Sequence, residues 1–280
     1  MTDVIHSDKK EVQETPAPTS PIGDLTATDD APHLPSYDPH SEKPGIFQTL
    51  HFSENKSAVI VEFIGTFLFT LTIPLAGIND NETAPIAIGF MYMALVFSFA
   101  YLSGAHMNPA ISLACFLASE FPIWKLILYS IAQVGGSFAA AFYCIMIHGA
   151  DFPVPDAGLN FLTMIRFFLH EAVYTFVICS VVLHLCWSKR SKKGTRDASN
   201  YFGFAVGFAV LISYLCVGSV NNGAFNPAVA TGLIVARCFT TYCVPMASLW
   251  MFWASELGGA VVAAIFFLAL ESIPEDELEL

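Results

Sequence analysis

The sequence predicts an all-α membrane protein with six transmembrane helices and two re-entrant half-helices, arranged as an inverted repeat. Three observations support this fold class. The chain is 55% hydrophobic and only 13% charged, whereas soluble domains average about 25% charged residues. Six nearly uncharged stretches are long enough to cross a bilayer. Two shorter apolar segments each begin near the same tripeptide, Asn-Pro-Ala.

The N-terminal segment, residues 1–56, differs in composition from the rest of the chain. It holds seven prolines and ten acidic residues, and such a composition cannot bury enough apolar surface to offset the entropy of ordering. We therefore expect a disordered, acidic, proline-rich cytosolic tail, without the apolar core of a signal peptide. A short acidic cytosolic tail is expected over 271–280, which leaves 57–270 as the membrane domain.

Six stretches have the ~20 residues needed to cross ~30 Å of hydrocarbon. They cover about 57–77, 84–103, 123–147, 166–187, 201–220 and 246–270. The loop at 188–200 holds five of the twelve Lys and Arg residues, whereas the loops near 78–83 and 148–165 hold none. Because basic loops stay in the cytosol, this loop and both termini are expected there.

Two apolar segments, 106–118 and about 224–238, are too short to span the bilayer. The eleven residues from Asn108 to Ala118 offer about 16 Å of helix at 1.5 Å per residue, which is half the hydrocarbon thickness. Asn is a good N-cap and Pro is favoured at the first helical position. The tripeptides Asn108-Pro109-Ala110 and Asn226-Pro227-Ala228 therefore predict two half-helix starts, which are tolerated at such depth only beside a cavity or inside protein.

The two halves of the chain repeat each other. Gly89 precedes Asn108 by nineteen residues, and Gly207 precedes Asn226 by the same number. Glu62 and Glu171 lie near the start of the two halves, and Gln133 to Gly136 match Glu256 to Gly259. Each half holds three spans and one half-helix, and the odd number of crossings inverts the second copy. The two half-helix N-termini should therefore meet near the midplane.

The segments SGAHMNPAIS and GAFNPAVATG, in this arrangement, resemble the aquaporin (major intrinsic protein) family over about residues 57–270. The resemblance implies a six-helix channel with one pore per subunit, assembled as a homotetramer. It also implies that Glu62 and Glu171 brace the re-entrant loops through hydrogen bonds to the backbone. Glu256 takes the place of Gln133 in the repeat, and the sequence offers no specific role for it.

In such a pore the facing half-helices place partial positive charge at the centre, which disfavours cations and protons. Asn108 and Asn226 are expected to donate amide N–H groups to passing water; the alternative for each is a purely structural cap. The loops before them should expose backbone carbonyls to the pore as acceptors. The candidate residues are Gly104, Ala105, His106, Asn222 and Ala224. For His106 a structural role in its loop is preferred to pH gating.

The outer filter departs from the family pattern. Counted from the motifs, the resemblance places it at Ile88, Tyr214, Gly223 and Val229. Val229 stands where most members carry arginine, so this filter has no fixed charge. The first expectation is a passive water channel; a broader channel for glycerol, urea or ammonia is the alternative.

Other functions are less favoured by these residues. The intramembrane carboxylates could serve as relays of a proton-coupled transporter, and the paired glycines could pack a non-conducting structural protein. The sequence shows no nucleophile–base pair, metal cluster or phosphate loop, so we expect no enzyme, cofactor or metal. The net charge of −12 argues against nucleic acid as a partner.

The seven cysteines are expected to be small core residues. The protein is expected in the plasma membrane or a vacuolar membrane.

Overall fold

The computed structural model of the protein describes residues 54–78, 82–119, 121–149, 152–158, 160–188, 201–218, 223–240 and 243–274. The tail predicted over 1–56 lies outside the described residues up to position 53. The predicted basic loop beyond Ser188, the predicted pore residue Asn222 and the last six residues of the chain also lie outside them.

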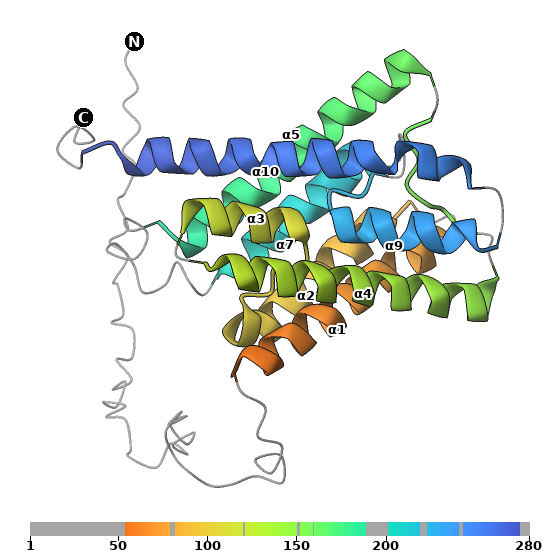
Figure 1. Cartoon of the computed structure of the whole chain (residues 1–280), viewed down its shortest axis with the longest axis horizontal. Helices are drawn as coiled ribbons and strands as arrows, with labels where there is room; N and C mark the ends of the chain where they lie inside the picture. Colours follow the sequence, from red (N-terminus) through yellow and green to blue (C-terminus); the bar gives the residue numbers. More distant parts are fainter. Residues whose placement is uncertain are drawn as a thin grey trace, which may run out of the picture. The chain divides into compact units, whose positions relative to one another are not determined.

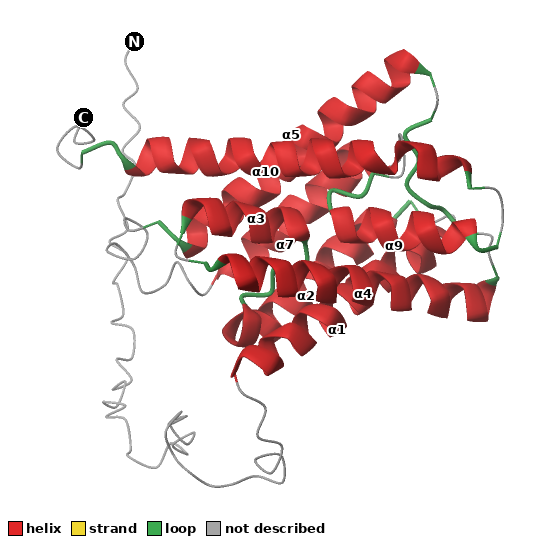
Figure 2. Ribbon diagram, in the orientation of Figure 1, coloured by secondary structure: helices red, strands yellow, loops and turns green. Residues whose placement is uncertain are grey.

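The described residues form helices joined by short connections (Figures 1 and 2). The elements are α1 (Glu54–Ile78), α2 (Ala84–Ser103), α3 (Pro109–Ala118), α4 (Ile123–His148), α5 (Phe161–Cys186), α7 (Phe202–Ser213), η2 (Tyr214–Gly218), α9 (Pro227–Cys238), η3 (Val244–Ser248) and α10 (Leu249–Glu271). Five of these helices, α1, α2, α4, α5 and α10, are long and apolar enough to cross a membrane. The architecture is therefore the predicted all-helical membrane fold.

The sixth predicted span, 201–220, is not one regular helix. Its α-helical part, α7, ends at Ser213 and continues as the π-helical turn η2, which starts at Tyr214. The apolar run Phe202–Val217 is shorter than the five long helices. Isolated π-turns interrupt the regular hydrogen bonding of a helix and occur frequently at functional sites. The interruption here falls on a residue that the sequence places in the filter.

The two half-helices begin where the tripeptides predict. The side chain of Asn108 accepts a hydrogen bond from the backbone N–H of Ala110 at 2.8 Å, at the start of α3. Asn226 accepts from Ala228 at 3.0 Å, at the start of α9. Each asparagine therefore satisfies an amide that the first helical turn leaves unpaired.

The helix contacts follow the sequence repeat. In the first half α1 packs on α4, and in the second α5 packs on α10. The half-helix α3 lies against α10 and α9 lies against α4, so each half-helix packs on the last span of the other half. Helices α2 and α7 pair at the centre, where a Cβ on either Gly89 or Gly207 would lie 3.1 Å from the other's carbonyl oxygen. The two halves of the chain therefore contact each other closely where α2 packs against α7.

Two glycines from the predicted pairs allow close contact between the long helices. A Cβ on Gly136 would lie 2.2 Å from the carbonyl oxygen of Phe63, and one on Gly259 would lie 2.3 Å from that of Ala172. The adjacent Gly258 makes no such contact. A Cβ there would meet no atom within 4 Å, because this residue is on the exposed face of α10.

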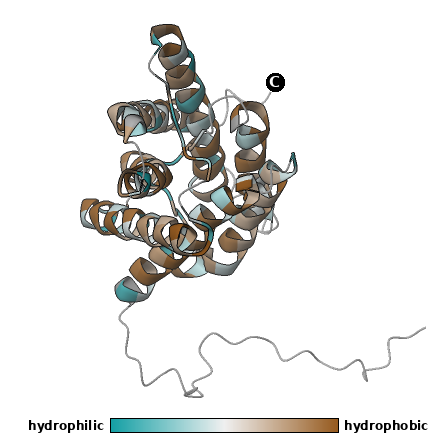
Figure 3. Ribbon diagram, turned by 90° about the vertical axis from the view of Figure 1, so that its right-hand side faces the viewer, coloured by the Kyte–Doolittle hydropathy of each residue, from teal (hydrophilic) through white to brown (hydrophobic). Residues whose placement is uncertain are grey.

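The outer faces of the long helices are apolar. Figure 3 shows hydrophobic residues distributed along the helices, with hydrophilic ones concentrated near helix ends. Large exposed side chains include Phe90, Ile131, Leu169, Phe204 and Ile265. Helices that are apolar all round require either a protein core or lipid around them, so these faces indicate an integral, multi-pass membrane protein.

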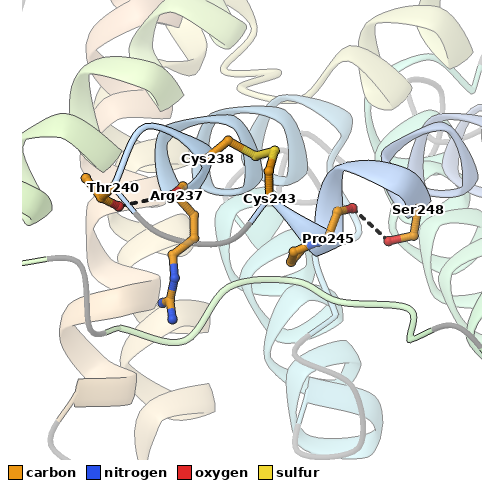
Figure 4. The surroundings of a disulfide bond; sticks show 6 residues. All are labelled: Arg237, Cys238, Thr240, Cys243, Pro245 and Ser248. Atoms are coloured by element: carbon orange, nitrogen blue, oxygen red, sulfur yellow. Dashed lines mark hydrogen bonds between the residues drawn. A yellow bond between two sulfur atoms is a disulfide. The ribbon is translucent and has the colours of Figure 1, made fainter.

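The prediction that all seven cysteines are core residues is wrong for the two that form a disulfide and for Cys216, and Cys186 is only partly buried. Cys238, the last residue of α9, forms a disulfide with Cys243, just before η3 (Figure 4). The turn after α9 brings their Cα atoms to 4.4 Å, a proximity that a spacing of five residues does not reveal by itself. Cys115, Cys144 and Cys179 are buried and free, as expected, whereas Cys216 is exposed.

Candidate functional site

The two half-helices meet through their capping asparagines. The side-chain amide of Asn108 donates to the carbonyl oxygen of Phe225 at 2.8 Å. The amide of Asn226 donates to the carbonyl of Met107, also at 2.8 Å. The two bonds are related by the repeat, because each joins an asparagine to the residue that precedes the other asparagine. An amide NH2 carries two N–H donors, so each asparagine has a second donor besides this one.

The residues that accept these bonds have unusual backbone conformations. Met107 has a φ of +47° and Phe225 a φ of +51°, in the left-handed region. Such residues cost on the order of 1–3 kcal/mol each and persist where surrounding contacts determine them. Ala105 shares this conformation with a φ of +49°, directly after Gly104, which ends α2 with a φ of +90°. The loop before α3 is thus held in a strained path.

Buried carboxylates hold both strained loops. Glu62 accepts from the backbone N–H groups of His106 and Met107. Glu171 accepts from Ala224 at 3.0 Å and from Phe225 at 2.8 Å. Both glutamates are fully buried. These bonds give each carboxylate the bracing geometry that the resemblance implies.

The role of Glu256 is visible only in the structure. Its Oε1 accepts from the backbone N–H of Asn226 at 2.8 Å, and the carboxyl group is fully buried. Its counterpart Gln133 donates from Nε2 to Glu62 at 2.8 Å. The two equivalent residues therefore act differently: Gln133 donates to the carboxylate of its half, whereas Glu256 accepts directly from the backbone at the start of α9.

His106 is part of the same support. Its ring is buried between the aromatic rings of Phe121 and Tyr129, with centroids at 4.9 and 5.5 Å. Its Nδ1 lies 3.1 Å from the hydroxyl of Ser112, in the first turns of α3. These contacts favour the structural role of His106 in its loop over pH gating.

A small cavity lies between the two asparagines. It is lined by Phe69, Tyr92, Asn108, Ile178, Val210, Tyr214, Ala224, Phe225 and Asn226. The cavity offers about 10 Å³ of room for the centre of a water molecule, which is close to the minimum that one water needs. Amide groups on one side and aromatic or aliphatic side chains around them form a site of the size and polarity of a single water.

Two tyrosines of the cavity wall bind backbone carbonyls. Tyr92 donates its hydroxyl to the carbonyl of His106 at 2.7 Å. Tyr214 donates to the carbonyl of Ala224 at 3.1 Å. His106 and Ala224 are equivalent in the repeat and are two of the predicted pore carbonyls. Each tyrosine hydroxyl therefore donates to the carbonyl two residues before one of the asparagines and uses part of that carbonyl's capacity to accept hydrogen bonds.

The structure brings the predicted filter residues into the buried interior. Ile88, Tyr214 and Val229 are each at most 4% exposed, and Tyr214 lines the cavity. Gly223 lies against Glu171, where a Cβ would be 2.9 Å from the carboxylate oxygen. Within the described ranges, no group of three or more His, Cys, Asp or Glu residues could hold a metal.

Sequence reasoning missed several cavity residues, above all Tyr92. Two signals could have found it. Tyr92 follows the predicted filter residue Ile88 by one helical turn on the buried face of α2. It also precedes Asn108 by sixteen residues, as Val210 precedes Asn226, so the repeat pairs two residues that line the same cavity.

Comparisons with known proteins show the family and the fold. The chain matches the family described as "Major intrinsic protein" over residues 48–267. It is 28% identical to Aquaporin-B of Dictyostelium discoideum, over 74% of this chain and 80% of that protein. It is 27% identical to Aquaporin Z of Rhodopseudomonas palustris, over 80% of this chain and 98% of that protein. Its fold is similar to that of the aquaglyceroporin from Plasmodium falciparum, with a TM-score of 0.61 and 19% identity over 80% of this chain and 99% of that one.

Proposed function

The chain belongs to the major intrinsic protein family, whose members are membrane channels and not enzymes, and from this premise we propose that it is a passive water channel. The observation that supports the proposal most is the crossed pair of asparagines beside a cavity of about 10 Å³ for water centres. A channel needs a polar point that replaces part of the water's hydration, set in walls that do not hold the water. The amides and the apolar wall supply these two properties.

The half-helices give this centre its selectivity against charge. The N-termini of α3 and α9 each carry roughly half a positive charge, and among the described residues the cavity lining contains no acidic side chain. A cation or hydrated proton at the centre would therefore be repelled. Water that offers its oxygen to the second N–H of Asn108 or Asn226 directs its hydrogens away from the centre, which breaks the chain of donors that proton hopping requires.

A broader channel for small neutral solutes is the second candidate. The predicted filter supports it, because Val229 brings no fixed charge to the position where arginine is usual. The size of the central cavity favours water, because glycerol and urea are larger than the single molecule it fits.

A proton-coupled transporter is less well supported. Glu62, Glu171 and Glu256 all accept hydrogen bonds from backbone amides of the loops that precede the half-helices. Carboxylates committed to holding the backbone in place are poor carriers, because releasing the backbone amides would leave them unpaired.

We further propose that the protein lies in the plasma membrane or a vacuolar membrane, with both termini on the cytosolic side. We also propose that its subunits form a homotetramer. The disulfide supports the orientation. Cys238 and Cys243 precede α10, whereas the C-terminus follows it, so they lie across the membrane from the C-terminus. Disulfides persist in oxidising compartments and are rare in the cytosol. The tetramer rests on the resemblance alone, and the mass of the purified protein in detergent would test it.

Osmotic shrinkage of proteoliposomes, followed by stopped-flow light scattering, tests the function. A passive water channel accelerates shrinkage with or without a proton gradient. Dependence on the gradient would favour the transporter, and a rate equal to that of empty vesicles would favour a structural protein. The same vesicles measured with glycerol, urea and ammonia define the solute range.

A further inference from the structure

We propose that Tyr92 is the specificity-determining residue of this pore, because its ring fills the centre and restricts passage to water. The inference rests on the proposed channel function and deepens it. It moves the discrimination between water and larger neutral solutes from the outer filter to the asparagine pair. There, Tyr92 lines the cavity together with Asn108 and Asn226.

The ring of Tyr92 is fixed at both ends. The side chain is 1% exposed, and its ring packs edge-on against Phe69 with centroids 4.8 Å apart. At its tip, the hydroxyl donates to the carbonyl of His106. That carbonyl belongs to the loop whose amides Glu62 holds. A solute therefore cannot push the ring aside without breaking a buried hydrogen bond and an aromatic contact.

The repeat supplies an internal comparison. Val210 is the counterpart of Tyr92 and lines the same cavity from α7. Two equivalent positions thus carry a large aromatic side chain in one half and a small aliphatic one in the other. A valine at both would enlarge the cavity by the difference in volume between the tyrosine and valine side chains, whereas the native pair leaves room for about one water.

The hydroxyl adds a chemical restriction to the steric one. A polyol or urea entering the centre must exchange its hydration for acceptors on the wall. Tyr92 and Tyr214 already donate to the carbonyls of His106 and Ala224. Each carbonyl keeps one further lone pair, so a solute with several donors leaves some of them unpaired, at a cost in desolvation. Water needs fewer partners and fits the remaining space.

The test replaces Tyr92 with the residue of its repeat counterpart. Wild type, Tyr92→Val and Tyr92→Phe are compared in proteoliposomes for water, glycerol and urea permeability. Tyr101→Val is the matched control, because Tyr101 lies on the same helix and is 80% exposed. We expect Tyr92→Val to raise glycerol and urea permeability by at least about tenfold, since even one methylene in a close-fitting site changes selectivity by that order.

Tyr92→Phe keeps the ring and should still exclude both solutes, and Tyr101→Val should match wild type. A Tyr92→Val protein that conducts water but still excludes glycerol and urea would overturn the inference and leave the water channel standing. If the wild-type protein passes glycerol at a rate comparable to that of Tyr92→Val, the inference is also overturned and the water channel still stands. If wild type passes no water, the proposed function itself fails. Should Tyr92→Val not fold, Tyr92→Ile, which retains more volume, replaces it with the same expected outcomes.

Discussion

Placing a methyl group on Gly259 should destabilise the protein, whereas the same change at the adjacent Gly258 should not. The added Cβ at 259 would lie 2.3 Å from the carbonyl oxygen of Ala172 on α5. Even weak C–H···O contacts leave about 3.3–3.6 Å between carbon and oxygen, so α10 and α5 would have to separate by about 1 Å. Overpacking of this kind typically costs about 1–3 kcal/mol.

Gly258→Ala serves as the control for the change in conformational entropy that any replacement of glycine by alanine brings. Replacing glycine by alanine in a helix gains about 0.5–1 kcal/mol from conformational entropy, and both variants share this gain. Because a Cβ at Gly258 meets no atom within 4 Å, the difference between Gly259→Ala and Gly258→Ala isolates the packing cost, about 1–3 kcal/mol. Thermal unfolding in detergent, followed by circular dichroism, measures it. Equal melting temperatures for the two variants would refute the close approach of α5 and α10.

Three further outcomes concern the site. Glu256→Gln keeps an acceptor for the N–H of Asn226 and should retain water flux and stability. Glu256→Ala should reduce the free energy of unfolding by ~1–3 kcal/mol, because it leaves a buried amide unpaired, and the lower melting temperature would show this. Asn226→Asp keeps the cap but loses the donor to the opposite loop and adds negative charge at the centre. A pH-sensitive dye inside vesicles should therefore report faster proton entry, and an unchanged rate would count against the role of the central field. In the Tyr92→Val background, Val229→Arg should reduce glycerol flux more than water flux, and equal losses would contradict the filter assignment.

The framework of the site could be predicted because each part has a local signal. The Asn-Pro-Ala tripeptides predict half-helix starts through capping and proline geometry, and Asn108 and Asn226 cap α3 and α9. The repeat pairs Glu62 with Glu171, and the resemblance to the family implies that they brace the loops, whose backbone amides donate to both carboxylates.

Features that depend on tertiary distances could not be predicted in this way. The disulfide between Cys238 and Cys243 requires the turn after α9, which apolar patterning does not describe. Tyr92 belongs to no motif; its register with Ile88 and with the repeat places it on the face of α2 that the filter occupies, but only the packing of α2 against its neighbours shows that its ring lines the cavity. The role of Glu256 likewise became evident only when its contact with the N–H of Asn226 was visible.

The crossed bonds from Asn108 to Phe225 and from Asn226 to Met107 mean that neither repeat can complete its own centre. A single half expressed alone would leave its asparagine amide and its strained carbonyl without their partners. An ancestral gene that encoded one repeat could have made this centre only by pairing two copies in opposite orientations. Separate genes for the two halves should accordingly restore the protein only when both are expressed together.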